Sequence, residues 1–196
     1  GQPIPVMAYT NAEEVELFLN GRSLGRKKKG EPYVIPVGKK ISEDLRFTTK
    51  YRVVWEVPYA PGTLTAVAFT GGQTVASSEV RTAGAPARVV LVPDRTILHA
   101  DGEDLSFVTV RIEDAEGNLV PGADNLVRFA VEGAGRIAAV DNGNAASLEP
   151  FQAKERKAFS GLALLVVRSN RGVSGSIRVQ ATSDGLTAAG AVLRAE

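Results

Sequence analysis

The stretch VTVRIED, from Val108 to Asp114, alternates strictly between apolar and polar side chains. Because side chains of an extended strand point to opposite faces in turn, Val108, Val110 and Ile112 share one face. The stretch therefore predicts a β-strand with one buried face and one wet face. The same alternation recurs in three further stretches, VELFLN, VRFAVE and SIRVQAT, which begin at Val15, Val127 and Ser176.

The segment ALLVVRS, from Ala163, is almost continuously apolar, which is typical of a strand in the middle of a sheet. No stretch of the chain has the sustained apolar period of a helix. Turn-forming pairs such as Asn20-Gly21, Gly71-Gly72 and Asp184-Gly185 separate the apolar runs. Short strands, divided by turns roughly every ten residues, predict an all-β chain of antiparallel sandwiches.

The segment TAGAPA, from Thr82 to Ala87, has small residues and no periodicity, and a new strand pattern starts at Arg88. We therefore divide the chain into two domains, residues 1–83 and 84–196. A chain of 196 residues suits two domains of roughly 100 residues, each able to bury its own core. Between Lys29 and Lys50 the sequence is polar and contains prolines, so it predicts a long loop or an extended hairpin.

The charges of the chain nearly cancel, with 23 basic residues against 22 acidic ones, so no global field favours nucleic acid or an anionic membrane. Cysteine is absent and His99 is the single histidine, which excludes thiolate and multi-histidine metal sites. No apolar run approaches the roughly 20 residues of a membrane span, and we expect no membrane insertion. The start at Gly1 lacks the features of a signal peptide, so we expect any export signal outside these residues.

Two stretches of the first domain, TNAEEVELFLNGRSLGRKK from Thr10 and VPYAPGTLTAVAF from Val57, resemble accessory β-sandwich domains of β-galactosidase-like enzymes in glycoside hydrolase family 2. In the second domain, residues 100–137 look like a bacterial immunoglobulin-like repeat. The continuation from Ala138 to Ser169 is similar to the galactosidase version of that repeat, through a Val-Asp-Asn-Gly turn and the residues Ser147, Glu149, Phe151 and Arg156. The resemblance implies two tandem antiparallel immunoglobulin-like β-sandwich domains.

The resemblance also implies that the chemistry lies elsewhere. Retaining glycosidases of this family use two glutamates about 5 Å apart on a barrel of about 250 residues, and this chain has no barrel pattern. We therefore expect the non-catalytic C-terminal region of an enzyme that removes terminal β-linked galactose from oligosaccharides or glycans. The expected partners are the catalytic barrel of the parent chain, a second copy of the enzyme and, through the parent, the carbohydrate substrate. We expect no cofactor, and a bacterial periplasmic or secreted location.

Two other functions remain open. Immunoglobulin-like repeats also occur in bacterial cell-surface adhesins, where they project a receptor-binding tip, and a sandwich can serve as a carbohydrate-binding module. For such a module, Tyr51, Trp55 and Tyr59 are the candidate sugar-stacking residues. Trp55, however, shares a strand face with Val53 and Val57, and this alternation favours a place in the core.

The remaining polar groups are interpreted as structural. The basic hairpin of Arg22, Arg26 and residues 27–29 has no interleaved aromatic residue, so we interpret it as a solvated turn. Gly172–Ser176 superficially resembles a nucleophile elbow, but its last glycine is missing and its flanks predict a hairpin. Gly133–Gly135 leads into a strand and is no phosphate loop. We interpret as solvated charges the carboxylates of Glu13-Glu14, Glu43-Asp44, Asp101 to Asp104 and Glu113-Asp114.

The loop from Val140 to Ser147 is the candidate for contact with a substrate rim or a neighbouring domain. Asp141, Asn142 and Asn144 are short polar residues without an apolar period, and we expect them to be exposed. Long irregular segments on a sandwich are often functional or interfacial. The alternative is an Asx-type turn, because the closing glutamate of a calcium loop is missing.

Overall fold

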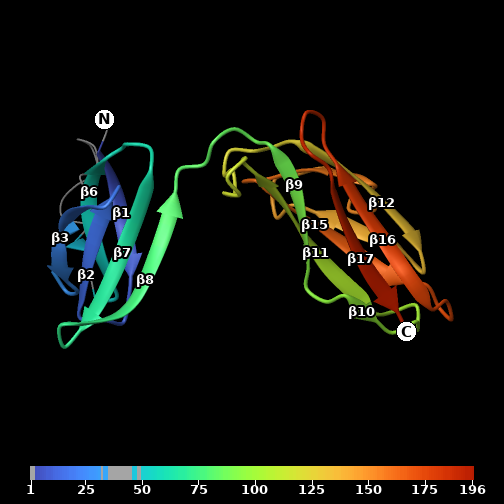
Figure 1. The fold of residues 1–196 in the computed structure, drawn as a ribbon, viewed down its shortest axis with the longest axis horizontal. Helices are drawn as coiled ribbons and strands as arrows, with labels where there is room; N and C mark the ends of the chain where they lie inside the picture. Colours follow the sequence, from blue (N-terminus) through green and yellow to red (C-terminus); the bar gives the residue numbers. More distant parts are fainter. Residues whose placement is uncertain (1–2, 32, 35–45, 48–49) are drawn as a thin grey trace. The chain divides into compact units, whose positions relative to one another are not determined.

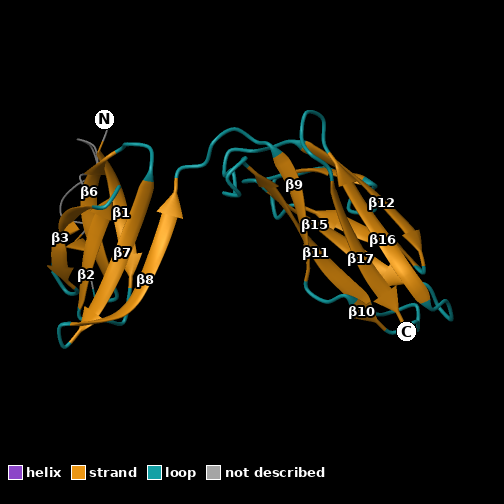
Figure 2. Ribbon diagram, viewed as in Figure 1, coloured by secondary structure: helices purple, strands orange, loops and turns teal. Residues whose placement is uncertain are grey.

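The computed structural model describes residues 3–31, 33–34, 46–47 and 50–196, which form strands and loops (Figure 1, Figure 2). Within these ranges there is no helix, hence none long and apolar enough to cross a membrane. The chain divides into two compact units, Gly1–Thr82 and Ala83–Glu196. This division falls one residue before the boundary drawn from the sequence. The all-β architecture confirms the predicted fold class.

Unit 1 contains a four-stranded sheet in the order β3-β2-β7-β8 and a two-stranded sheet of β1 and β6, all antiparallel. A further short pair, β4 with β5, lies in the segment predicted as a loop or an extended hairpin, of which residues 35–45 are outside the described ranges. The strands are β1 (Pro3–Tyr9), β2 (Glu14–Leu19), β3 (Arg22–Lys28), β4 (Tyr33–Val34), β5 (Arg46–Phe47), β6 (Arg52–Pro58), β7 (Thr63–Thr70) and β8 (Gln73–Arg81).

The core of unit 1 lies between its two larger sheets and includes Trp55 of β6. Trp55 is 3% exposed, and its indole N–H donates to the carbonyl of Gly25 on β3 at 3.3 Å. Its apolar neighbours come from both sheets, as the alternation predicts: Val15, Leu17, Val53, Val57 and Ala68. The predicted core position of Trp55 is therefore confirmed.

Asn20 and Gly21 form the two-residue turn between β2 and β3, with φ angles of 51° and 78°. Positive φ at both positions gives the type I′ geometry that matches the twist of a hairpin, and Asn and Gly adopt it more readily than other residues. The Asn20 amide also accepts the N–H of Thr63 at 2.8 Å and donates to the carbonyl of Pro61 at 3.2 Å. One side chain thus links this turn to the entry of β7.

Unit 2 is a sandwich of a five-stranded sheet, β10-β17-β16-β12-β14, and a four-stranded sheet, β13-β15-β11-β9. Neighbouring strands are antiparallel, except that the short β10 runs parallel to β17. The predicted central strand is β15, which pairs with β11 and β13. The strands are β9 (Arg88–Pro93), β10 (Ile97–Leu98), β11 (Leu105–Glu113), β12 (Leu126–Gly133), β13 (Gly135–Asp141), β14 (Glu155–Lys157), β15 (Leu162–Ser169), β16 (Gly175–Thr182) and β17 (Ala189–Ala195).

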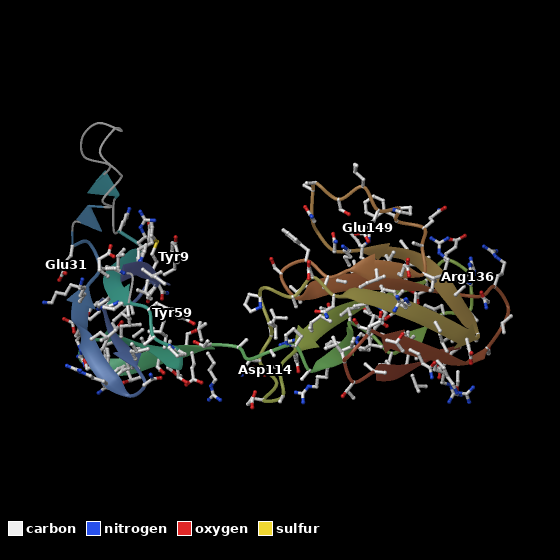
Figure 3. The ribbon with its side chains drawn as sticks, turned by 90° about the horizontal axis from the view of Figure 1, so that it is seen from above. Tyr9, Glu31, Tyr59, Asp114, Arg136 and Glu149 are labelled. Carbon is white, nitrogen blue, oxygen red and sulfur yellow. The ribbon has the colours of Figure 1, made fainter. Side chains whose placement is uncertain are left out.

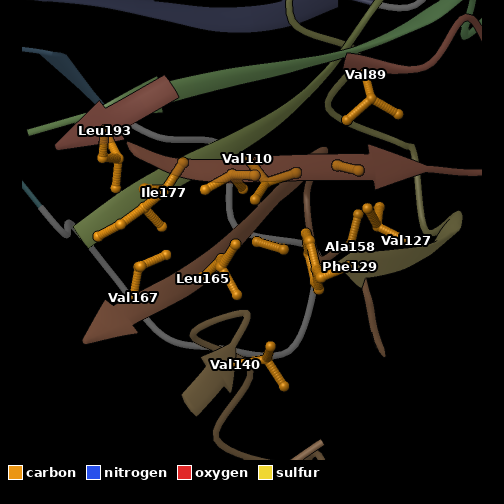
Figure 4. Packing of buried hydrophobic residues seen from close by; sticks show 14 of the residues in the cluster. Val89, Val110, Val127, Phe129, Val140, Ala158, Leu165, Val167, Ile177 and Leu193 are labelled. Carbon is orange, nitrogen blue, oxygen red and sulfur yellow. The ribbon is translucent and has the colours of Figure 1, made fainter. Parts of the chain in front are cut away.

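Inward-facing residues of both sheets form the core of unit 2 (Figure 4). Val108, Val110 and Ile112 of β11 are buried, as their alternation predicts, in one cluster with Leu165 of β15 and Ile177 of β16. Complete burial of one such side chain contributes about 1.5–3 kcal/mol. This cluster holds the two sheets together, so the loops at the ends of the sandwich are free to vary.

The segment Gly172–Ser176 crosses between the two sheets, and the prediction that it lies in a hairpin was wrong. The strand before it, β15, belongs to the four-stranded sheet, whereas β16 belongs to the five-stranded sheet. Both strands bury apolar residues, and alternation alone does not decide which neighbours they pair with. The segment still runs from strand to strand, not from strand to helix as a nucleophile elbow does.

Asp114 fixes the start of unit 2. Its carboxylate accepts N–H groups from the Gly84 backbone at 2.8 Å and from the Asn118 backbone and side chain at 2.7 and 2.9 Å. These hydrogen bonds, first that from Gly84, lower the pKa of Asp114 from 3.8 to about 2. Asp114 is 1% exposed, and the buried Glu113 pairs with Arg88 at 3.0 Å. The interpretation of these two carboxylates as solvated charges was wrong, because Asp114 accepts N–H groups of the surrounding loops and Glu113 pairs with an arginine of β9.

The change Trp55→Ala should destabilise unit 1 by about 3–5 kcal/mol, because it leaves a cavity in a small core. Urea unfolding of the whole chain, followed by circular dichroism, measures this loss against the transition of unit 2. The matched control is Tyr51→Ala, since Tyr51 is 62% exposed; its effect should stay within about 0.5 kcal/mol. Equal stability of the two variants would contradict the core role of Trp55.

The change Asp114→Asn should lower the stability of unit 2 at neutral pH and reduce its loss in acid. Because the folded-state pKa lies below the ordinary value, the carboxylate stabilises the fold above about pH 4, and this contribution disappears as the pH falls toward 2. The difference between the melting temperatures at about pH 7 and about pH 3 should therefore be smaller in the variant than in the wild type. The control is Asp184→Asn, at a strongly exposed carboxylate. An unchanged acid dependence in Asp114→Asn would refute this role.

Candidate functional site

The loop predicted from Val140 to Ser147 begins within β13 and continues to residue 154. From here on, the candidate loop means residues 142–154, which join β13 of the four-stranded sheet to β14 of the five-stranded sheet. It therefore connects the two layers of unit 2; Glu149 is labelled on it in Figure 3. The three residues singled out in the sequence lie at its start, with Asp141 as the last residue of β13. The structure brings Asp141, Asn142 and Asn144 together in consecutive turns.

Each of these three side chains accepts a backbone N–H two residues further along the chain. The donors are Gly143 for Asp141, Asn144 for Asn142 and Ala146 for Asn144, at 3.3, 3.0 and 3.0 Å. A run of Asx-type turns results, which confirms the structural alternative. The three residues are half-buried, so the prediction that they are exposed was wrong. Their oxygens point toward main-chain donors of the loop, which would otherwise need other partners.

Arg156 of β14 holds the rest of the loop. Its guanidinium is 1% exposed and donates to the carbonyls of Val140, Glu149 and Pro150 at 2.8, 3.1 and 3.3 Å. It also donates to the hydroxyl of Ser147 at 3.3 Å and lies 3.7 Å from the Glu149 carboxylate. A buried cation is tolerated when it is paired and hydrogen-bonded in this way. Arg156 thus ties the middle of the loop to β13.

Because its polar groups turn inward, the loop presents apolar side chains to solvent. Leu148 is 99% exposed and Phe151 is 61% exposed, with the Phe151 ring 5.3 Å from the guanidinium carbon of Arg156. Single exposed apolar residues are common on protein surfaces. Two of them within four positions of a loop whose backbone is fixed by hydrogen bonds favour contact with another surface.

Sequence reasoning missed the roles of Arg156 and Leu148. In the sequence, Arg156 is noted only among the residues shared with the galactosidase version of the repeat, and Leu148 is not noted. One signal could have identified Arg156: it is two residues from the buried Ala158 and thus on the same, inward face of an extended strand. A cation at an inward position requires several nearby acceptors, which the following and preceding loop residues must supply.

Most cations of the basic hairpin contact neighbouring groups of unit 1, which supports its interpretation as an ordinary surface turn. Arg26 pairs with Glu16 at 3.2 Å and with Glu14 at 3.6 Å, and Lys28 pairs with Glu14 at 3.7 Å. The amines of Lys27 and Lys29 donate to backbone carbonyls at 2.8 Å. These contacts engage four of the five cations of the hairpin within unit 1.

Other carboxylates named in the sequence receive N–H groups at turns. Glu13, Asp101 and Asp104 each accept backbone hydrogen bonds. The N–H groups of Asp104 and then Glu103 lower the pKa of Asp101. The pair Glu43-Asp44 lies outside the described residues. In the part of the chain that the structure describes, no group of three or more His, Cys, Asp or Glu side chains could hold a metal ion.

The family model of the glycoside hydrolase family 2 C-terminal domain 5 matches residues 89–192, which include the whole candidate loop. The chain belongs to glycoside hydrolase family 2. A second model, a domain of unknown function named DUF4982, matches residues 1–76 in unit 1. The two matches together place both units in the accessory, non-catalytic C-terminal region of this family.

Similar proteins are all much longer than this chain. A β-galactosidase of Bacteroides ovatus is 47% identical over 197 residues, which are 100% of this chain and 21% of that protein. A solved family 2 hydrolase from Bacteroides cellulosilyticus has a TM-score of 0.86 and 38% identity, covering 100% of this chain and 23% of its own. A solved β-glycosidase from Bacteroides vulgatus has a TM-score of 0.85 and 28% identity, covering 99% and 23%. The chain therefore spans about a fifth of the length of these family 2 relatives.

The change Arg156→Met should destabilise unit 2 by about 3 kcal/mol or more, because buried carbonyls lose their donor at about 1–3 kcal/mol each. Amide hydrogen exchange across residues 142–154 should rise at the same time. The matched control is Arg171→Met, at an exposed pair with Glu103, where the expected effect is about 0–1 kcal/mol. If exchange in the loop is unchanged, Arg156 does not hold it.

Proposed function

We propose that this chain is the non-catalytic C-terminal region of a retaining β-galactosidase-like hydrolase whose barrel removes terminal β-linked galactose from oligosaccharides or glycans. The observation that carries this proposal is the 47% identity, along the entire chain, to a β-galactosidase. The chain contributes two packed sandwiches, and the two glutamates of the retaining mechanism belong to the barrel of the parent enzyme. No cofactor enters this function.

The physical role that we propose for unit 2 is to contact the catalytic barrel, or the substrate rim, through residues 142–154. Support comes from the exposed Leu148 and Phe151 on a loop whose backbone is fixed by Arg156. In this proposal Asp141, Asn142 and Asn144 contribute indirectly, because their Asx turns set the shape of the loop. Subunit contacts in the parent enzyme, and its periplasmic or secreted location, are further parts of the proposal.

The two alternative functions lose their main support. Of the three candidate sugar-stacking residues, Trp55 is buried between the sheets of unit 1, whereas Tyr51 and Tyr59 are exposed. A carbohydrate-binding module therefore loses the largest of its three aromatic platforms. The hypothesis that the chain is part of an adhesin depended on the immunoglobulin-like repeat alone. Family 2 membership accounts for that repeat together with the sequence of unit 1.

The isolated chain should release no chromophore from β-galactoside, β-glucuronide or β-mannoside substrates, because the carboxylate pair of the mechanism lies outside it. A longer polypeptide that includes the barrel should hydrolyse the β-galactoside. In that polypeptide, Leu148→Ser combined with Phe151→Ser should lower kcat or the melting temperature, while the isolated chain melts as before. The matched control is Val192→Ser, at an exposed position of β17.

Two results would count against the proposal. Turnover by the isolated chain that is lost when one of its own carboxylates is replaced would show that the chain is itself an enzyme. If the double variant at Leu148 and Phe151 changes kcat and the melting temperature of the longer polypeptide no more than Val192→Ser does, the loop has no docking role. The first result concerns the activity and the second concerns the contact, so they test the two parts separately.

A further inference from the structure

A polar hollow of about 470 Å³ is lined by residues of β13, of β15 and of the end of the candidate loop. Its volume is within the range of about 300–1,000 Å³ typical of small-molecule sites. Basic, polar and small apolar side chains line it together: Arg136, Ile137, Gln152, Ala153, Lys154 and Arg168. Three different segments, β13, β15 and the end of the candidate loop, therefore supply its cations.

The cations of the hollow have no carboxylate partner. Arg136 and Arg168 are directly opposite each other in the register of β13 and β15. Like charges at such positions destabilise a sheet, and they are usually separated or neutralised. Within the described ranges, neither arginine nor Lys154 lies within 4.0 Å of an acidic oxygen. This contrasts with the basic hairpin of unit 1, which pairs with Glu14 and Glu16.

Hydrogen bonds hold the guanidinium of Arg136 in position, whereas Nε of Arg168 has no acceptor among the described protein atoms. Nη1 of Arg136, labelled in Figure 3, donates to the Ser169 carbonyl at 3.1 Å and to Oδ1 of Asn170 at 2.8 Å, which fixes the direction of its other N–H groups. Nε of Arg168 is buried and has no hydrogen-bond partner among the described protein atoms. A buried donor without an acceptor is unfavourable. An oxyanion in the hollow would accept from both arginines and remove their mutual repulsion.

The walls of the hollow suit a sugar. A β-bulge between Ile137 and Ala139 interrupts the pairing of β13 with β15 beside the two arginines, and bulges are common where a strand forms a site. An adjoining hollow of about 430 Å³ shares Arg136, Ile137 and Lys154 and adds the carboxylate of Glu132. The carboxylate of Glu132 can accept hydrogen bonds from hydroxyl groups of a ligand whose acidic group lies on the cations.

We propose that this hollow binds an acidic saccharide, with its carboxylate or sulfate group on Arg136 and Arg168, Lys154 at the rim, and its hydroxyl groups toward Glu132. The site shares residues 152–154 with the loop of the proposed function but does not include Leu148 or Phe151, and it requires no catalytic barrel and no second chain. Its ligand chemistry is an oxyanion on a polyhydroxylated ring. Binding should weaken as salt is added, since the charges at the rim are partly exposed.

Nuclear magnetic resonance of the whole chain tests the site with three probes: D-glucuronate, galactose 6-sulfate and neutral D-galactose. The two acidic sugars should shift the Nε–Hε signals of Arg136 and Arg168 in a saturable manner, and galactose should not. Arg168→Gln should weaken this binding about tenfold or more, the loss expected for one hydrogen bond between charged groups. The control is Arg171→Gln, at an exposed arginine already paired with Glu103, which should leave binding unchanged.

The melting temperature verifies that the variants are folded. Arg168→Gln should melt at or above the wild-type temperature at low salt, because it removes one of two opposed cations. Arg136→Lys keeps a charge but loses the fork of donors, so it should also weaken binding. Three results would overturn the proposal: no saturable shift with either acidic sugar, equal weakening by Arg171→Gln, or tighter binding of a hexaglutamate peptide than of both sugars. The last would assign the hollow to an acidic protein segment.

Discussion

The buried guanidinium of Arg156 connects the two layers of unit 2 at a place where no strand pairing does so. Arg156 belongs to the five-stranded sheet, and its shortest hydrogen bond reaches the Val140 carbonyl in the four-stranded sheet. The same group holds the carbonyls of Glu149 and Pro150. A single desolvated charge, whose two Nη groups make all of these hydrogen bonds, thus fixes the sandwich and the shape of the loop together. The exposed positions of Leu148 and Phe151 follow from this arrangement.

Charge is used in two ways in this molecule. Carboxylates such as Asp114 and Asp101 accept backbone N–H groups, so they close turns and are not available to a ligand. The arginines beside β13 lack that compensation, and their charges are directed toward a concave surface. The net charge of only +1 therefore hides a local imbalance, which depends on the side chains that the two sheets bring together.

Sequence periodicity predicted those parts of the fold that depend on neighbours along the chain. Alternation identified β11 and the burial of Trp55, and Asn20-Gly21 identified a hairpin turn. Periodicity does not show that β15 and β16 belong to different sheets, because sheet membership depends on partners far away in sequence. For the candidate loop, the residue pattern predicted its position and the Asx alternative, but not the inward direction of Asn142 and Asn144. That direction depends on the hydrogen bonds of the folded loop.

The small sheet of unit 1 leaves one side of β1 without a described neighbour. Free strand edges are templates for association with other chains, and proteins protect them with residues that interrupt the hydrogen-bond ladder. Pro3 and Pro5 lie on this strand and offer no N–H to an incoming strand. An unbroken intermolecular ladder cannot form along the first half of β1. The sandwich therefore carries, within its own first strand, a barrier to edge-to-edge aggregation.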